Sequence, residues 1–118
     1  SSGAALHGSP LSGGYAGAKQ MQRWLCGYAR DEAAQLGRDL TIQCILPQLS
    51  PHTELGAAAI KAYARKAGVD PRQFVAKRFG TPVSPALAGE SLVSMLSEDG
   101  GPAELLLSGK GLQALGDT

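Results

Sequence analysis

The segment LTIQCILP, residues 40–47, combines β-branched and aliphatic side chains over the length of a single strand. It ends in the apolar run Cys44-Ile-Leu46, which is typical of a strand that a parallel sheet buries on both faces. Pro47 has no backbone N–H to donate and therefore ends the strand. We accordingly predict a buried strand over residues 40–46 in an α/β fold.

A long helix is predicted before this strand, from Ser12 or Tyr15 to Leu36. The segment is rich in Ala, Gln, Arg, Met and Leu, which favour helices, and Gly37 supplies the expected C-terminal cap. Apolar residues recur within it at helical spacing, at Tyr15, Ala18, Met21, Leu25 and Tyr28. The Gly-, Ser- and Pro-rich residues 3–14 predict a loop.

Three helices and a second strand are predicted after residue 47. The helices cover residues 54–67, 71–79 and 82–97, and Pro82 stands at the first helical position of the third. AELLLS at 103–108 predicts a second buried strand, which a glycine-containing tail follows. Two strands alone leave sheet edges and apolar faces uncovered. Because the chain also begins Ser-Ser-Gly without an initiator Met, we expect further strands from an upstream portion or a partner chain.

Composition indicates a single globular domain and excludes several classes of function. The chain has 118 residues, of which 43% are hydrophobic. A net charge of +1, with no basic stripe that carries interleaved aromatics, argues against a nucleic-acid partner. No apolar run has the length of a membrane span and no signal-peptide pattern occurs, so we expect no membrane association.

Cys26 and Cys44 are too far apart in sequence for the paired spacing that zinc sites use. Cys44 falls in an apolar run and Cys26 in a helix, where a free cysteine behaves as a small hydrophobe. We therefore predict that both are structural, and that the protein works in a reduced, cytoplasmic environment.

Tyr15 and Lys19 stand four positions apart at the start of the long helix, so their side chains share one face. A lysine cation beside a phenol stabilises the phenolate, which makes the tyrosine a usable acid and base at neutral pH. Ser2 lies 13 positions before Tyr15, where its hydroxyl would donate to a substrate carbonyl. Tyr and Lys at this spacing are also an ordinary helix pair, so the interpretation depends on the surrounding sequence.

The order of Ser2, Tyr15-x-x-x-Lys19, a long helix and a buried strand that ends in proline resembles the C-terminal half of the short-chain dehydrogenase/reductase family. The resemblance implies a Rossmann-type doubly wound parallel sheet, of which residues 1–118 are the C-terminal catalytic portion without the N-terminal nucleotide-binding half. It implies an NAD(P)-dependent oxidoreductase that interconverts a small-molecule alcohol and a carbonyl by hydride transfer. Tyr15 would be the acid and base, and Ser2 would orient the substrate. Tyr15 and Lys19 would also bind the cofactor, NAD or NADP, with Lys19 on its ribose.

Residues 45–53, ILPQLSPHT, resemble the family's cofactor turn, in which a strand ends in Pro-Gly and leads to a Thr. This location suits the rule that open α/β sheets bind ligands beyond the carboxyl ends of their strands. The resemblance implies contacts with the nicotinamide half of the cofactor from Pro47, Gln48, Leu49, Ser50 and Thr53. The sequence departs from the family pattern, since Gln48 replaces the glycine and Thr53 falls later than usual.

The rest of the chain follows the family's order. Arg78-Phe-Gly-Thr-Pro82 resembles its R-x-G-x-P segment, and residues 54–79 match the variable segment that caps the substrate. The loop before Tyr15 matches the region that lines the substrate pocket, so Ala4 and His7 join Ser2 and Tyr15 as substrate-binding candidates. His52 is interpreted as a solvated neighbour of the cofactor turn.

The chain lacks the family's Gly-rich dinucleotide loop and contains no Asn, so the pyrophosphate site and one catalytic residue are expected upstream. We therefore expect the chain alone to be inactive as an enzyme. In relatives the helix that carries the tyrosine joins a subunit interface, which implies a homodimer or homotetramer of the intact protein. The alternative is a truncated, non-catalytic relative that keeps the oligomerisation helices and acts as an interaction module.

Overall fold

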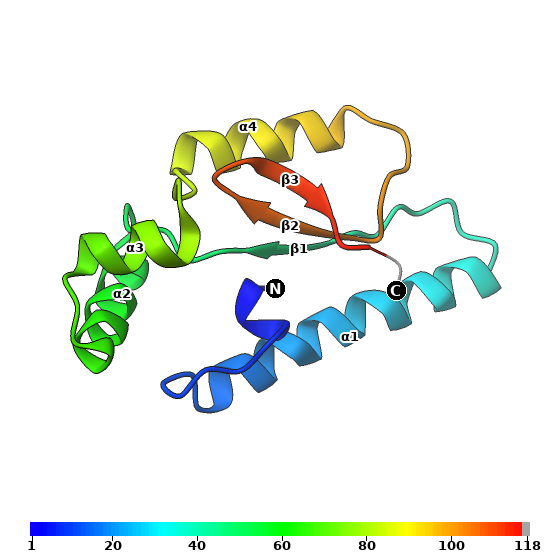
Figure 1. The fold of residues 1–118 in the computed structure, drawn as a ribbon. Helices are drawn as coiled ribbons and strands as arrows, with labels where there is room; N and C mark the ends of the chain where they lie inside the picture. The colour runs from blue at the N-terminus through cyan, green and yellow to red at the C-terminus, as the bar shows by residue number, and fades with distance from the viewer. Residues whose placement is uncertain (117–118) are drawn as a thin grey trace.

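A three-stranded mixed sheet forms the centre of the fold (Figure 1), seen in a computed structural model that describes residues 1–116. β1 (Cys44–Pro47) and β2 (Glu104–Ser108) run parallel, and β3 (Gly111–Ala114) pairs antiparallel with β2. The strand order is β1-β2-β3, so β1 lies at one edge. The chain is therefore mixed α/β, and the parallel pairing of the two predicted strands is confirmed. The last two residues of the predicted tail, 117 and 118, lie outside the described part.

Within residues 1–116, four α-helices and one short 3-10 helix accompany the sheet. They are η1 (Gly3–Ala5), α1 (Gly14–Gln35), α2 (Glu54–Ala67), α3 (Pro71–Phe79) and α4 (Pro85–Leu96). α2 and α3 have the predicted bounds because each begins at a side-chain cap. The hydroxyl of Thr53 accepts from the backbone N–H of Gly56 at 3.0 Å. The carboxylate of Asp70 accepts from the backbone N–H of Arg72 at 2.8 Å.

Helices cover both faces of the sheet, with α1 and α4 on opposite sides (Figure 1). Successive side chains of a strand point to opposite faces. Toward α1, Cys44 and Leu46 form a buried cluster with Ala5, against which Cys26 of α1 packs. On the other face, Leu105 and Leu112 line a surface together with residues of α4.

Two predicted elements are shorter than expected. β1 begins at Cys44 rather than Leu40 because its partner β2 begins only at Glu104, directly opposite Cys44. α4 begins at Pro85 rather than Pro82, since the Ser84 hydroxyl accepts from the Leu87 N–H at 3.1 Å and so caps the helix there.

The sequence predicts a tail where β3 forms and a loop where η1 forms. β3 is only four residues long and forms because the chain turns back at Gly109-Lys110. Gly109 is required at this turn, since a Cβ there would stand 1.9 Å from the carbonyl oxygen of Thr81. η1 forms because Ser2 caps it, with its hydroxyl accepting from the Ala4 N–H at 3.2 Å.

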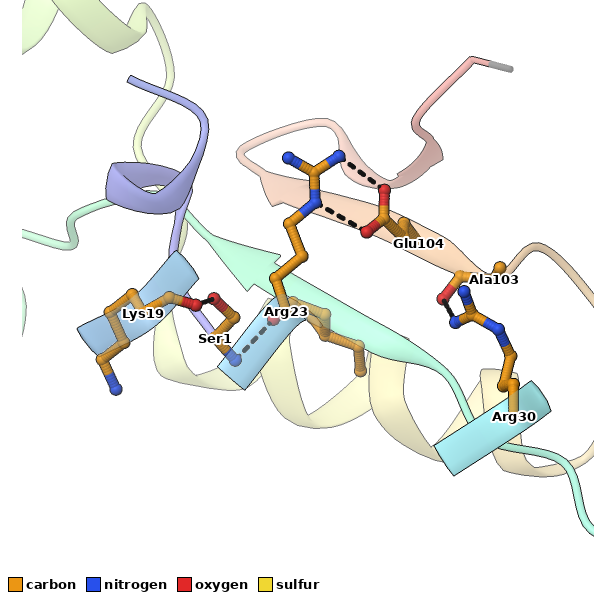
Figure 2. A network of polar contacts seen from close by, with 7 residues as sticks. Ser1, Lys19, Arg23, Arg30, Ala103 and Glu104 are labelled. Carbon is orange, nitrogen blue, oxygen red and sulfur yellow. Dashed lines mark hydrogen bonds and ion pairs between the residues drawn. The ribbon is translucent and has the colours of Figure 1, made fainter. Parts of the chain in front are cut away.

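α1 packs on the sheet through charged and small residues. Arg23, Cys26, Arg30 and Ala33 recur at helical spacing and form its inner stripe. Arg23 makes a two-point ion pair with Glu104, with Nε and one terminal nitrogen at 2.6 and 2.7 Å from the two carboxylate oxygens. Arg30 donates to the carbonyl oxygen of Ala103 at 3.2 Å. Figure 2 shows both arginines reaching from α1 to the start of β2.

The Arg23–Glu104 pair predicts that the free energy of unfolding falls at acid pH. The hydrogen bond from Arg23 holds the pKa of Glu104 below its ordinary value. A lowered pKa in the folded state means that the stabilisation is present above the ordinary pKa of glutamate and is lost as the pH falls through the folded value. We expect Glu104→Gln to lower the free energy of unfolding at neutral pH by about 1–2 kcal/mol.

Urea unfolding at neutral and acid pH measures the contribution of the ion pair. It compares the parent with Glu104→Gln and with the exposed control Glu98→Gln. Glu104→Gln should lose less free energy of unfolding on acidification than the parent and the control do. An equal loss in all three proteins would show that the ion pair does not contribute.

Candidate functional site

Ser1 joins the two elements that carry the predicted site, β1 and α1. Its backbone nitrogen donates to the carbonyl oxygen of Ile45 at 3.0 Å, and its hydroxyl donates to the carbonyl oxygen of Lys19 at 2.7 Å. Figure 2 shows Ser1 between the helix and the strand. The residues that follow Ser1 are therefore placed close to both elements.

Ser2 and Gly3 lie at the carboxyl end of β1. A Cβ on Gly3 would stand 3.4 Å from the carbonyl oxygen of Pro47, the last residue of that strand. The Ser2 oxygen accepts the Ala4 N–H through one lone pair, which leaves the hydroxyl hydrogen for donation. Ser2 is thus held in place by its cap and retains the donor that the predicted role requires.

Tyr15 and Lys19 lie in the first two turns of α1. The Lys19 ammonium is 5.4 Å from the centroid of the Tyr15 ring, within the range of a cation–π contact. The Tyr15 side chain is 46% exposed, so a small molecule can reach it. The structure therefore brings this predicted pair together, and Ser1 ties the Lys19 backbone to the segment that contains Ser2.

The turn after β1 is fixed mainly by its own side chains. The Ser50 hydroxyl donates to the carbonyl oxygen of Val83 at 2.7 Å and accepts from the His52 N–H. The Thr53 hydroxyl donates to the carbonyl oxygen of Ser50 at 3.3 Å while it caps α2. These two predicted cofactor ligands thus shape the turn, and direct contacts are left to Pro47, Gln48 and Leu49.

Gln48 carries a buried acceptor without a partner. Its backbone N–H donates to the carbonyl oxygen of Leu107 at 2.9 Å, which continues the sheet beyond β1. Its side-chain amide oxygen is buried and has no hydrogen-bond partner among the described residues. An unsatisfied buried acceptor costs about 1–3 kcal/mol. A ligand that brings an N–H group, as the carboxamide of nicotinamide does, fits this residue chemically.

The remaining candidates lie around the N-terminal segment. Ala4 is half-buried in η1, and His7 is exposed in the loop between η1 and α1. His52 is exposed in the turn after β1. Nothing else in the structure assigns a chemical role to either histidine.

Tyr63 of α2 was not identified from the sequence. It connects residues 54–79, the segment expected to cap the substrate, to the loop between η1 and α1. Its hydroxyl forms a short hydrogen bond with the hydroxyl of Ser9, 54 positions away. Its ring stacks on Phe74 of α3, with centroids 6.0 Å apart. The contact therefore holds the α2–α3 pair against the loop that precedes Tyr15. No local spacing in the sequence indicates it, because it depends on how distant segments pack.

Two open hollows lie away from these residues. One borders Trp24, Tyr28 and the Arg23–Glu104 pair on α1, and the other lies between α4 and the sheet. Neither is lined by Tyr15, Lys19 or the turn after β1. The candidate site at the end of β1 therefore lies outside both hollows.

Comparisons of the chain with protein-family models, curated proteins and solved structures found no match. Among the described residues, no helix combines the length and the hydropathy that crossing a bilayer requires.

The turn after β1 depends on the absence of a side chain at Gly56. A Cβ there would stand 1.8 Å from the carbonyl oxygen of Ser50, so the turn and the start of α2 could not keep their positions. We expect Gly56→Ala to lower the free energy of unfolding by about 1–3 kcal/mol.

Gly17→Ala is the matched control, because Gly17 lies in α1 with open space around its Cβ position. Removing an exposed helical glycine should raise the free energy of unfolding by up to about 1 kcal/mol. Denaturant titration of both variants checks the pair. Two changes of the same sign would contradict the close approach at Gly56.

Proposed function

We propose that the chain is the catalytic half of an NAD(P)-dependent short-chain dehydrogenase/reductase that interconverts an alcohol and a carbonyl. The observation that carries the proposal is the position of Ser1, which is hydrogen-bonded to both Lys19 and Ile45. This position brings the serine segment, the Tyr15–Lys19 pair and the end of β1 into one region. The parallel pairing of β1 and β2, with helices on both faces, supports a Rossmann-type doubly wound sheet in the intact protein.

Ser2 and Tyr15 would act on the substrate oxygen. The Ser2 hydroxyl donates to the carbonyl oxygen and fixes its direction. The Tyr15 hydroxyl gives its proton to that oxygen during reduction and takes it back during oxidation. The Lys19 cation, 5.4 Å from the ring centroid, stabilises the phenolate that remains after the proton leaves.

The turn after β1 would position the cofactor. Bound nicotinamide supplies the hydride for reduction or accepts it in oxidation. The Gln48 amide oxygen offers an acceptor to the carboxamide, and Pro47 and Leu49 flank it. Ser50 and Thr53 hold the turn in shape through their hydrogen bonds, and Lys19 would hold the nicotinamide ribose.

The substrate would lie between the N-terminal loop and the α2–α3 pair. Ala4 and His7 belong to that loop, and the Ser9–Tyr63 hydrogen bond joins it to α2. A reduced, cytoplasmic setting belongs to the same proposal, and both cysteines are free in the structure.

Tyr15→Phe in the intact protein tests the proposal. Loss of the hydroxyl should lower kcat by at least about 100-fold while nicotinamide cofactor binding persists, because general acid–base catalysis contributes on that order. Tyr28→Phe is the control, since Tyr28 lies on the same helix and stacks on Trp24 at 5.4 Å between centroids. Wild-type rates in Tyr15→Phe, measured by the absorbance of the reduced nicotinamide, would rule out the assignment.

A second candidate function, an interaction module, is favoured by the outer stripe of α1. We use this name for Met21, Trp24, Leu25 and Tyr28, which are all exposed, Trp24 by 63%. The apolar residues that show the predicted helical spacing thus face away from the sheet. Such a stripe is typical of a protein interface, and a homodimer or homotetramer would cover it. A non-catalytic relative would retain this stripe without turnover.

Trp24→Glu separates the outer stripe from the catalytic residues. In the intact protein we expect the oligomer to dissociate toward the protomer, because a charge replaces an apolar contact in the interface. Gln22→Glu, at an exposed neighbouring position, should leave the oligomeric mass unchanged. Light scattering measures both, and an unchanged mass in Trp24→Glu would exclude the stripe as an interface.

A further inference from the structure

Both cysteines of the chain lie in the layer between α1 and the sheet. Cys26 lies on the inner stripe of α1 and packs against the buried cluster that contains Cys44 of β1. The chain has no other cysteine. The two cysteines are 18 positions apart in sequence, and the packing of α1 on β1 brings them into one cluster.

The two thiols differ in their surroundings. Cys44 is 2% exposed, whereas Cys26 is half-buried. Burial raises the pKa of the Cys44 thiol, and the neighbouring Cys26 thiol raises it further. An oxidant from solution therefore meets Cys26 first, and Cys44 is held beside it as a protected thiol.

We propose that Cys26 and Cys44 form a redox-active pair that a hydroperoxide converts into a disulfide between α1 and β1. The Cys26 sulfur attacks the peroxide, the O–O bond breaks, and Cys26 becomes a sulfenic acid while an alcohol or water leaves. The Cys44 sulfur then attacks the Cys26 sulfur, the S–O bond breaks, and one water leaves as the disulfide forms. The two thiols lose two electrons and two protons in total, and the hydroperoxide is reduced.

The disulfide would join the elements that carry the proposed site. α1 bears Tyr15 and Lys19, and β1 leads into the turn after Pro47. The pair itself does not depend on the proposed reductase activity, since it rests on the packing of Cys26 against the buried cluster that contains Cys44. A thiol measurement therefore tests it even if Tyr15 proves inactive.

The experiment treats the intact protein with hydrogen peroxide, denatures it in the presence of N-ethylmaleimide, and determines its mass before and after digestion. Full oxidation should leave Cys26 and Cys44 without maleimide and yield one cross-linked peptide that contains both residues and is two hydrogen atoms lighter than the two separate peptides. Treatment with dithiothreitol should restore two maleimide adducts. In Cys44→Ala, Cys26 should instead stop at an oxygen-bearing product.

The opposite results overturn the proposal. If the wild-type protein retains both maleimide adducts after peroxide, the thiols do not react as a pair. If Cys26 gains oxygen at the same rate and to the same extent in the wild type and in Cys44→Ala, Cys44 does not resolve it. A disulfide found only between two protein molecules would assign the reactivity to Cys26 alone.

Discussion

Arg23 and Glu104 meet between α1 and the sheet, where each side chain is about a quarter exposed, and their two-point contact sets where the helix lies. A guanidinium and a carboxylate bond in parallel only at one distance and orientation. Arg30 repeats the anchoring two turns later, on the carbonyl oxygen of Ala103. α1 is thus positioned by directional polar contacts, and the small side chains of Cys26 and Ala33 allow it to approach the sheet.

This mode of attachment explains why the apolar spacing of α1 is a poor guide to its orientation. A periodic stripe predicts a helix correctly, because the spacing reflects the helical repeat. It does not state which neighbour the stripe faces. Here Met21, Leu25 and Tyr28 face outward, while Arg23 and Arg30 hold the helix on the sheet. The partner of an arginine is a long-range property that its neighbours in sequence do not encode.

The elements that local chemistry determines are the ones the sequence predicts well. α2 and α3 begin at the capping residues Thr53 and Asp70, and Gly68 ends α2. The Tyr15–Lys19 pair likewise needs only the helical repeat. By contrast, the start of β1 depends on where β2 begins. The Ser9–Tyr63 hydrogen bond and the packing of Cys26 against the cluster around Cys44 depend on how distant segments pack. Sequence spacing therefore identifies the candidate catalytic residues but not the contacts that hold them.

The two pairings of the sheet also differ in how far apart their strands lie along the chain. β2 and β3 are joined by Gly109 and Lys110 alone, so they can pair as soon as both are present. β1 must wait for β2, since Cys44 pairs with Glu104 across a connection that contains three helices. Closing such a connection carries a large entropic cost before any parallel hydrogen bond forms. The C-terminal hairpin is thus the natural template of the sheet, and β1 joins it late. Ser1 then hydrogen-bonds to Ile45 on the exposed edge of β1.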